Sequence, residues 1–454
     1  MSTKADRVEF VTGFDGSTPL DIVATTILPT LIGVLLVQEI DIQSTNTSTK
    51  FAVEFTLVIM PVVLSQMRLG LESPLGLSEL LYISPLIFSA LKLLKRRQVG
   101  DLVDKEMKSR KIVTMHRSAI SVMTYVAILA VDFRAFPREF CKCEVYGYGL
   151  MDLGTASFVF ASGLCSPWSR GKSKTKTKTQ KENKTLLRSA LKSLPLFILG
   201  AVRCAATKGL DYQEHVSEYG THWNFFFTLC AINFFSEGLL GYSNNIAGWR
   251  RRFIILLTFA IYQVALTGFG LQKYVEREGR TENIFDMNRE GLLGTLGYTC
   301  VFVVAEFIGR VCFWRGGGVG KWEGGNVLTG VAALAWIIFT VVSDENGLNL
   351  AVSRRTTNAA YVCWAVCVNT SLLLGLAVIV RTKGEGIMIF ESINRNGLVV
   401  FLLANLLTGA VNLSIDTLAV SNHVVAIEIV GVYMGVVCGV AVVLDKCFDL
   451  TLKL

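Results

Sequence analysis

The run HVVAIEIVGVYMGVVCGVAVVL, from His423 to Leu444, contains one acidic residue, Glu428, and neither lysine nor arginine. A helix needs about 20 predominantly apolar residues to cross the hydrocarbon core of a bilayer, which is about 30 Å thick. The run is long enough and apolar enough for one crossing. It therefore predicts a transmembrane helix near the end of the chain.

Similar apolar runs recur along the whole chain, and short polar segments separate them. We predict thirteen transmembrane helices, of which the second contains Glu54. The predicted spans are residues 21–40, 51–67, 77–94, 112–131, 147–165, 186–206, 223–242, 253–272, 291–309, 326–342, 356–380, 397–413 and 423–444. The connections between them are too short to hold a soluble domain. The sequence therefore predicts an all-α polytopic membrane helix bundle, with residues 1–454 as one domain.

The composition of the chain agrees with this class. Hydrophobic residues make up 52% of the 454 residues and charged residues 18%. Soluble domains average about 45–50% apolar and about 25% charged residues. The eleven cysteines are scattered, mostly within apolar runs, and predict neither a disulfide framework nor a metal site.

Lysine and arginine are distributed unevenly between the two sets of loops. Cytoplasmic loops usually carry the excess, and one set here holds roughly twice as many basic residues as the other. The basic set comprises residues 95–111, 170–184, 250–252, 310–321 and 381–383 and the C-terminal tail. We therefore predict a cytoplasmic C-terminus and an N-terminus across the membrane. The overall charge of +8 mostly reflects this bias, so we expect no nucleic-acid partner.

One member of the basic set is a low-complexity segment. The sequence GKSKTKTKTQKENK, from Gly171 to Lys184, has no apolar period and alternates lysine with small polar residues. Such composition cannot bury a core and is typical of solvated, unstructured chain. We predict that this segment is a mobile basic cytoplasmic loop.

Polar residues gather on the side opposite the basic loops. Charged groups within a bilayer cost about 2.5–3.5 kcal/mol each and are usually paired or functional. Four loops carry them: Asp132 and Lys142 in the first; Arg203, Lys208, Asp211, His215, Glu218, His222, Trp223 and Asn224 at the second; Asn288, Arg289 and Glu290 in the third; Asn412 and Asp416 in the fourth. We therefore expect a polar binding site at this face.

The stretch Phe133–Phe140 follows the first of these residues. It is rich in phenylalanine and contains Pro137. It is too polar to span a bilayer and too apolar for a free loop. We expect it to be re-entrant or to lie flat on the membrane interface.

The residue types alone leave structural alternatives open. Asp132 can be a helix-end charge in water, Lys142 an interfacial lysine that snorkels, and His222 a residue of the aromatic belt. His215 and Glu218, three positions apart, would share a helix face as a structural pair or an acid–base unit. The histidines lack the H-E-x-x-H spacing of a zinc site, so we predict no metal.

Four long segments extend over nearly the whole chain. They are AVDFRAFPREFCKCEVYGYGLMDLGTASFVFASG (Ala130–Gly163), GLDYQEHVSEYGTHWNFFFTL (Gly209–Leu229), NREGLLGTLGY (Asn288–Tyr298) and FLLANLLTGAVNLSIDT (Phe401–Thr417). Together with VEFVTGFDGST (Val8–Thr18), these segments resemble the GPI inositol acyltransferase family. They follow one another in the same order as in that family. That family is thought to have thirteen spans. The chain departs from it at Arg134, where the family has proline.

The resemblance implies a reaction. The family transfers a fatty acyl chain, typically palmitoyl, from acyl-CoA to the inositol 2-hydroxyl of glucosaminyl-phosphatidylinositol, with no further cofactor. Its proposed catalytic aspartate and lysine, ten residues apart, match Asp132 and Lys142. A carboxylate can accept the hydroxyl proton and an ammonium can stabilise the oxyanion. Lysine can instead act by lowering the pKa of the aspartate.

The resemblance also implies partners and a location. We expect acyl-CoA, glucosaminyl-phosphatidylinositol and membrane lipids as partners, with no obligate protein partner, in the endoplasmic reticulum membrane with a lumenal N-terminus. Residues 211–224 are expected to bind the acceptor and Asn412 to bind substrate, and Arg117 is expected either to anchor its helix at the cytoplasmic side or to meet the CoA phosphates. Because acyl-CoA is made on the cytoplasmic side, it must reach into the bundle.

Two other classes of protein remain as alternatives. A lipid or ion transporter would be expected to have an internal repeat and polar residues on both faces, and neither is evident in the sequence. An unrelated membrane O-acyltransferase would use His222 as its catalytic histidine, with Asn224 nearby. Separate substitutions of His222 and Asp132 discriminate between the two acyltransferases.

Overall fold

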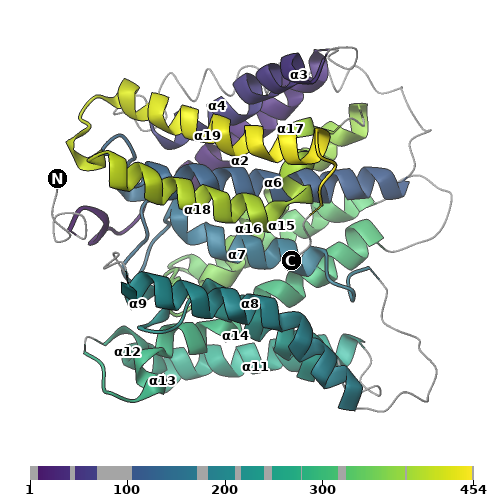
Figure 1. Cartoon of the computed structure of the whole chain (residues 1–454). Helices are drawn as coiled ribbons and strands as arrows, with labels where there is room; N and C mark the ends of the chain where they lie inside the picture. The colour runs from purple at the N-terminus through teal and green to yellow at the C-terminus, as the bar shows by residue number, and fades with distance from the viewer. Residues whose placement is uncertain are drawn as a thin grey trace.

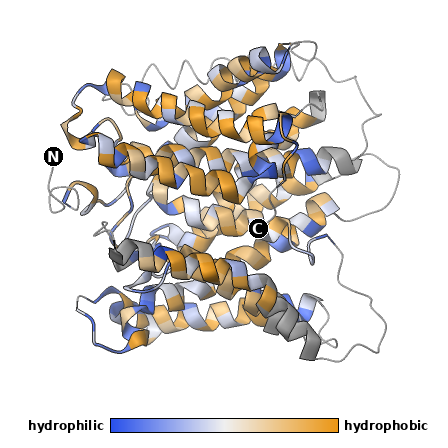
Figure 2. Cartoon of the chain, in the orientation of Figure 1, coloured by the Kyte–Doolittle hydropathy of each residue, from blue (hydrophilic) through white to orange (hydrophobic). Residues whose placement is uncertain are grey.

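The computed structural model describes residues 9–40, 46–68, 105–170, 183–209, 216–239, 248–277, 279–314, 324–383 and 386–451. Within these ranges the chain is mostly helical and contains no β-strand. The long helices run side by side in one bundle (Figure 1), and they are apolar along most of their length (Figure 2). The predicted all-α membrane helix bundle is confirmed.

Nine helices of the described chain are long and apolar enough to cross a bilayer. They are α2 (Pro19–Glu39), Thr47–Gln66, α6 (Lys105–Ala130), α11 (Gly248–Gly268), α14 (Arg289–Ile308), α15 (Gly324–Ser343), α16 (Ala359–Lys383), α18 (Gly397–Ser414) and α19 (His423–Lys446). Thr47–Gln66 comprises α3 (Thr47–Glu54), the π-helical turn η1 (Phe55–Ile59) and α4 (Met60–Gln66), and a second π turn, η4 (Gly309–Trp314), extends α14.

Three more predicted spans coincide with shorter apolar helices. These are α7 (Leu150–Leu164), the apolar part Ser193–Ala205 of α8 (Asn183–Gly209), and α10 (Phe225–Asn233), which continues into the π turn η3 (Phe234–Leu239). The predicted span 77–94 and residues 171–182 of the basic loop lie outside the described residues. The count of thirteen spans therefore stays a prediction.

Short elements between the spans were not predicted. They are α9 (Val216–Tyr219), α12 (Leu271–Glu276), α13 (Ile284–Met287), α17 (Met388–Arg395) and the 3₁₀ turns η2 (Arg138–Phe140) and η5 (Thr417–Ala419). The predicted span 253–272 is wrong at its end, because α11 stops at Gly268. Gly270 then takes a left-handed conformation, with φ of 72°, and redirects the chain into α12.

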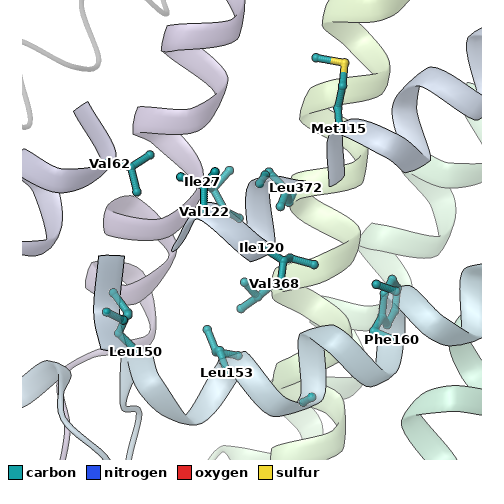
Figure 3. Close-up of a cluster of buried hydrophobic side chains, with 14 of the residues drawn as sticks. Ile27, Val62, Met115, Ile120, Val122, Leu150, Leu153, Phe160, Val368 and Leu372 are labelled. Carbon is teal, nitrogen blue, oxygen red and sulfur yellow. The ribbon is translucent and has the colours of Figure 1, made fainter. Parts of the chain in front are cut away.

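The helix α6 lies at the centre of the bundle and packs against α4, α7, α16, α17, α18 and α19. Figure 3 shows the apolar core where α2, α4, α6, α7 and α16 meet. Ile120 of α6 lies there near Val368 and Leu372 of α16, and Val122 of α6 lies near Ile27 of α2. Because lipid tails are as apolar as leucine, such packing, and not exclusion from water, drives association between membrane helices.

Glu54 interrupts the second span and is fully buried. Its carboxylate accepts hydrogen bonds from the backbone N–H groups of Met388 at 2.9 Å and Ile389 at 2.8 Å. It thus caps the N-terminus of α17, where unpaired N–H groups favour a negative charge. The Ser118 hydroxyl of α6 donates to the carbonyl of Phe390 and fixes α17 from the other side.

The helices define two ends of the bundle. The end where α6 stops and α7, α10 and α14 begin also holds α9, α12, α13 and the N-terminus (Figure 1). We call it the Asp132 end. The opposite end holds α17 and the start of α11. There Arg251 and Arg252 both bond the fully buried Glu306 of α14, Arg252 at 3.0 Å.

Close contact between α7 and α14 depends on Gly163. A Cβ atom at this position would lie 2.3 Å from the carbonyl oxygen of Phe302, whereas one at Gly154 would have no neighbour nearer than the Thr124 hydroxyl at 3.8 Å. Gly163→Ala should therefore lower the melting temperature of the detergent-purified protein, because overpacking costs about 1–3 kcal/mol.

Gly154→Ala is the matched control on the same helix. It should leave the melting temperature unchanged or raise it slightly, since alanine favours a helix over glycine by about 1 kcal/mol. Equal melting temperatures for the two variants would contradict the close approach of α7 and α14.

Candidate functional site

The segment after α6, residues 131–149, forms a compact loop without regular helix apart from η2. Phe133, Phe136 and Phe140 are fully buried in the protein core. Arg138 donates hydrogen bonds to the carbonyl groups of Val131 at 3.1 Å, Phe133 at 2.9 Å and Phe136 at 2.7 Å. One guanidinium therefore satisfies the carbonyls that the loop turns inward.

Asp132 lies at the start of this loop, immediately beyond the end of α6. The side-chain amide of Asn412, on α18, donates to Asp132 Oδ2 at 2.7 Å. The other amide atom of Asn412, Oδ1, is buried and accepts no hydrogen bond within the described chain. The structure thus places Asn412, which we predicted to bind substrate, against the carboxylate of Asp132.

Lys142 belongs to a ring of contacts that is made of ionic pairs and closed by one backbone hydrogen bond. Its ammonium lies 2.8 Å from Glu218 Oε1, and the guanidinium of Arg354 bonds the same oxygen, also at 2.8 Å. Arg354 Nε lies 3.7 Å from Asp152 Oδ1, and Asp152 Oδ2 accepts a hydrogen bond at 3.0 Å from the backbone N–H of Cys143. Because Cys143 follows Lys142, the ring contacts both the ammonium and the adjoining backbone. We call these residues the Lys142 ring.

Arg354 is the most constrained cation of this ring. Its guanidinium lies over the Tyr219 ring, 5.2 Å from the ring centroid, and the Tyr219 hydroxyl lies 2.9 Å from Thr155 Oγ1. Burial alone would lower the pKa of Arg354, but the Glu218 carboxylate and further neighbours raise it well above its ordinary value. The guanidinium therefore stays charged in this buried position.

Asp132 and Lys142 both act electrostatically on the Cys141 thiol. Burial raises the pKa of the Cys141 thiol, Lys142 acts on it in the opposite direction, and Asp132 raises it further. The charges of Lys142 and Asp132 thus both act on the buried thiol of Cys141. The loop brings a carboxylate, held by α18, and an ammonium, held by α9, to one end of the bundle.

The segment that leads into α10 is tied to the protein itself. The backbone N–H of His222 donates to Asn288 Oδ1 at 2.8 Å, and the Trp223 indole donates to the Thr228 hydroxyl at 2.9 Å. Asn224 is buried, caps α10, and donates to the carbonyl of Gly200 at 2.8 Å. In this structure these predicted substrate-binding residues position α10.

The remaining predicted site residues are more scattered. Asp211, His215 and the side chain of Lys208 lie outside the described residues. Arg203 is exposed on α8, and Arg117 is exposed on α6 although His116 and Ser118 are fully buried. Arg117 stands fifteen positions before Asp132, or about 22 Å along the helix axis. Arg117 therefore lies at a different depth along the bundle axis from Asp132.

The third polar loop forms a buried ionic network. Glu290 is bonded by Arg280 at 2.8 Å and by Arg355 at 3.2 Å. Asp286 is bonded by Arg289 at 3.0 Å. The loop is thereby locked against the start of α14, beside the Lys142 ring.

Sequence reasoning missed Asp152 and Arg354. Asp152 carried a signal, because it is an acid inside the apolar stretch LMDLGTASFVF, and intramembrane acids are usually functional or paired. Arg354 carried none, because a loop arginine beside an apolar span is common. Within the described chain, no three histidine, cysteine or acidic side chains could hold a metal ion together.

The cysteine beside Lys142 is not suited to carry an acyl group. Burial raises the pKa of the Cys143 thiol, and the Asp152 carboxylate raises it further. At neutral pH less thiolate is present than in an ordinary thiol, and thiolate is the reactive form. N-ethylmaleimide should therefore label Cys143 much more slowly than the exposed Cys447, as measured by peptide mass spectrometry.

Cys447→Ser provides the control for this labelling, because it should remove the fast-reacting peptide and leave the rest unchanged. Labelling of Cys143 at the rate of Cys447 would contradict the half-buried position of its thiol beside Asp152.

Fold and site together define a polytopic α-helical membrane protein that gathers paired carboxylates and cations at one end of its bundle. The family model of GWT1 matches residues 3–444. The chain is 34% identical to GPI-anchored wall transfer protein 1 of Gibberella zeae, with 100% of this chain and 99% of that protein covered. It is 32% identical to the Aspergillus fumigatus protein of the same name, with 97% of each covered.

The chain belongs to the GWT1 family. The family resemblance inferred from the sequence segments is thereby confirmed.

Proposed function

We propose that the protein acts in GPI-anchor biosynthesis and transfers a fatty acyl chain, typically palmitoyl, from acyl-CoA to the inositol 2-hydroxyl of glucosaminyl-phosphatidylinositol. Membership of a family whose relatives are named GPI-anchored wall transfer protein 1 supports this role. The observation that carries the proposal is the arrangement of Asp132 and Lys142. One loop presents both, and different helices hold each side chain.

The proposed reaction uses these two residues as base and electrostatic stabiliser. Asp132 accepts the proton of the inositol hydroxyl while the hydroxyl oxygen attacks the thioester carbonyl carbon. A C–O bond forms, and the ammonium of Lys142 stabilises the negative oxygen of the tetrahedral intermediate. The C–S bond then breaks, and the proton passes from Asp132 to the departing sulfur. The products are the acylated inositol and CoA with a free thiol.

Asn412 orients the base in this scheme. Its amide donates to one carboxylate oxygen of Asp132, and its own buried oxygen Oδ1 lies beside the carboxylate as a further acceptor. A hydroxyl that approaches Asp132 would therefore meet two acceptor groups. The oxygen Oδ1 of Asn412 can accept a hydrogen bond from a hydroxyl of a sugar-like alcohol. An apolar ligand would leave this buried acceptor without a hydrogen bond, which costs free energy.

The donor is proposed to approach from the opposite end of the bundle. Arg117, exposed on α6 between the buried His116 and Ser118, would meet the CoA phosphates, and the thioester would reach Asp132 along the helix. The helix axis between the two residues measures about 22 Å. An elongated donor of this kind could keep its phosphates near the basic loops while it reacts at the Asp132 end.

We further propose an endoplasmic reticulum location with a lumenal Asp132 end. Basic residues support this orientation: Arg170 lies against Trp314, and Arg251 against Trp168, at the end opposite Asp132. A tag at the N-terminus should be protected from protease in sealed microsomes, and a tag within residues 171–184 should be cleaved. Equal protection of both tags would contradict the orientation.

Asp132→Asn is the central test of the proposed chemistry. The substitution keeps the volume and most hydrogen bonds but removes proton acceptance, and a positioned base contributes roughly 10²–10⁴ in rate. The purified variant should bind palmitoyl-CoA normally while its turnover on glucosaminyl-phosphatidylinositol falls by at least about a hundredfold. The measurement is acyl transfer by detergent-purified protein.

Two controls accompany this test. Lys142→Arg keeps the charge but changes its shape and should reduce activity without abolishing it, whereas Lys142→Met should abolish it. If Asp132 were only a helix-end residue, asparagine would serve as well as aspartate and the variant would stay active. Loss with His222→Ala but not with Asp132→Asn would favour the histidine-dependent acyltransferase instead.

A further inference from the structure

The Lys142 ring contains two cations that share one carboxylate oxygen. Glu218 Oε1 lies 2.8 Å from the ammonium of Lys142 and 2.8 Å from the guanidinium of Arg354. In the proposed reaction, however, the ammonium must stabilise an oxyanion on the substrate. A lysine held by a carboxylate offers less positive charge to a third group, so the contact with Glu218 opposes the function of Lys142.

We propose that Arg354 is a positioning residue that retains Glu218 when Lys142 leaves it for the developing oxyanion. This inference rests on the proposed function, because it assigns Lys142 to the oxyanion. Arg354 then acts as the resident counter-ion of Glu218, and Lys142 as an exchangeable one.

Burial of the two cations supports this division. The side chain of Lys142 is 28% exposed and that of Arg354 only 7%. Lysine carries its charge on a flexible four-carbon stem, whereas the planar guanidinium of arginine can bond two groups at once. Arg354 contacts Glu218, Asp152 and the face of Tyr219 together. Of the two cations, Lys142 is therefore the one that can move.

The energetics of a partly buried carboxylate explain why two cations are needed. Removing one partner of a buried ion pair is strongly destabilising, because the other charge is left uncompensated. With Arg354 in place, Glu218 keeps a bonded cation when Lys142 departs. Without Arg354, Lys142 would leave Glu218 at a higher cost, because the carboxylate would lose the more buried of its two cations.

The backbone next to Lys142 stays fixed during this exchange. Asp152 accepts the backbone N–H of Cys143, and Arg354 lies against the other oxygen of the same carboxylate. A Cβ atom at Gly149 would lie 2.4 Å from Asp152 Oδ2, so only glycine lets the loop approach this closely. The stem of Lys142 thus starts from a rigid point, and only its end moves.

The decisive experiment is a double-mutant comparison of acyl-transfer rates. Arg354→Met should lower kcat by roughly tenfold or more, with little change in KM for palmitoyl-CoA, because Lys142 becomes trapped on Glu218. Adding Glu218→Gln to Arg354→Met removes the trapping charge and should restore roughly fivefold or more of the lost kcat. A purely structural role for Arg354 predicts a double variant no more active than Arg354→Met, and that result would overturn the proposal.

Arg355→Met is the matched control. Arg355 is the adjacent arginine and is half-buried, but it bonds Glu290 and not Glu218. Any loss of activity in Arg355→Met should not be rescued by Glu218→Gln. Rescue of both arginine variants would show a nonspecific effect and would contradict the assignment of Arg354.

Melting temperatures of all variants separate folding from catalysis. If Arg354→Met cannot be purified, Arg354→Gln removes the same charge with a polar side chain, and the same rescue by Glu218→Gln decides the question. Absence of acyl transfer by the unaltered protein would refute the proposed function itself. Activity in the unaltered protein without rescue in the double variant would refute only the role of Arg354.

Discussion

Buried carboxylates join the helices of this bundle, because inside a bilayer no water is available to solvate a charge. Each must find its partner on another element. Glu54 finds the backbone N–H groups of Met388 and Ile389, and Glu306 finds Arg251 of the preceding span. These pairs determine which helices are neighbours. Apolar contacts between spans resemble contacts between a span and lipid, so they select neighbours only where the side chains pack closely.

The same constraint organises the candidate site. At the Asp132 end, carboxylates and cations again pair across elements that lie far apart in the chain, and one of these pairs, Lys142 with Glu218, is only partly buried. Lys142 and Glu218 keep some exposure, whereas Glu54 and Glu306 have none. A charge that is partly exposed can exchange partners at moderate cost, and one that is sealed in the core cannot. The bundle thus separates structural ion pairs from those available for chemistry.

Much of the fold could be predicted from the sequence, because a span is a local property. A run such as His423–Leu444 carries its own length and hydropathy, and α19 occupies almost the same residues. The short helix Met388–Arg395 could not be predicted in this way, because its N-terminus is stabilised by Glu54, more than three hundred residues earlier. Breaks such as the turn at Gly270 depend on one backbone conformation within an apolar stretch.

The sequence indicated the loops of the candidate site but only part of its contacts. Asp132 and Lys142 stood out as charges beside spans, and a family resemblance named them. Arg354 joins Lys142 only through Glu218, and sequence spacing does not show such pairings. Asn224 has a structural contact that the sequence did not predict. An amide beside aromatic residues suggested head-group binding, but the same group is also a good helix cap, and the structure uses it so.

The cap that Glu54 provides for α17 has a consequence for how the chain is made. Glu54 precedes its partner Met388 by 334 residues. At a synthesis rate of roughly 5–20 residues per second, about 20 to 70 s separate the two at the ribosome. Throughout that interval the second span contains an acid whose native partner does not yet exist. Membrane insertion of this span must therefore precede its final packing, and the native arrangement of the first helices is completed only after the last ones are synthesised.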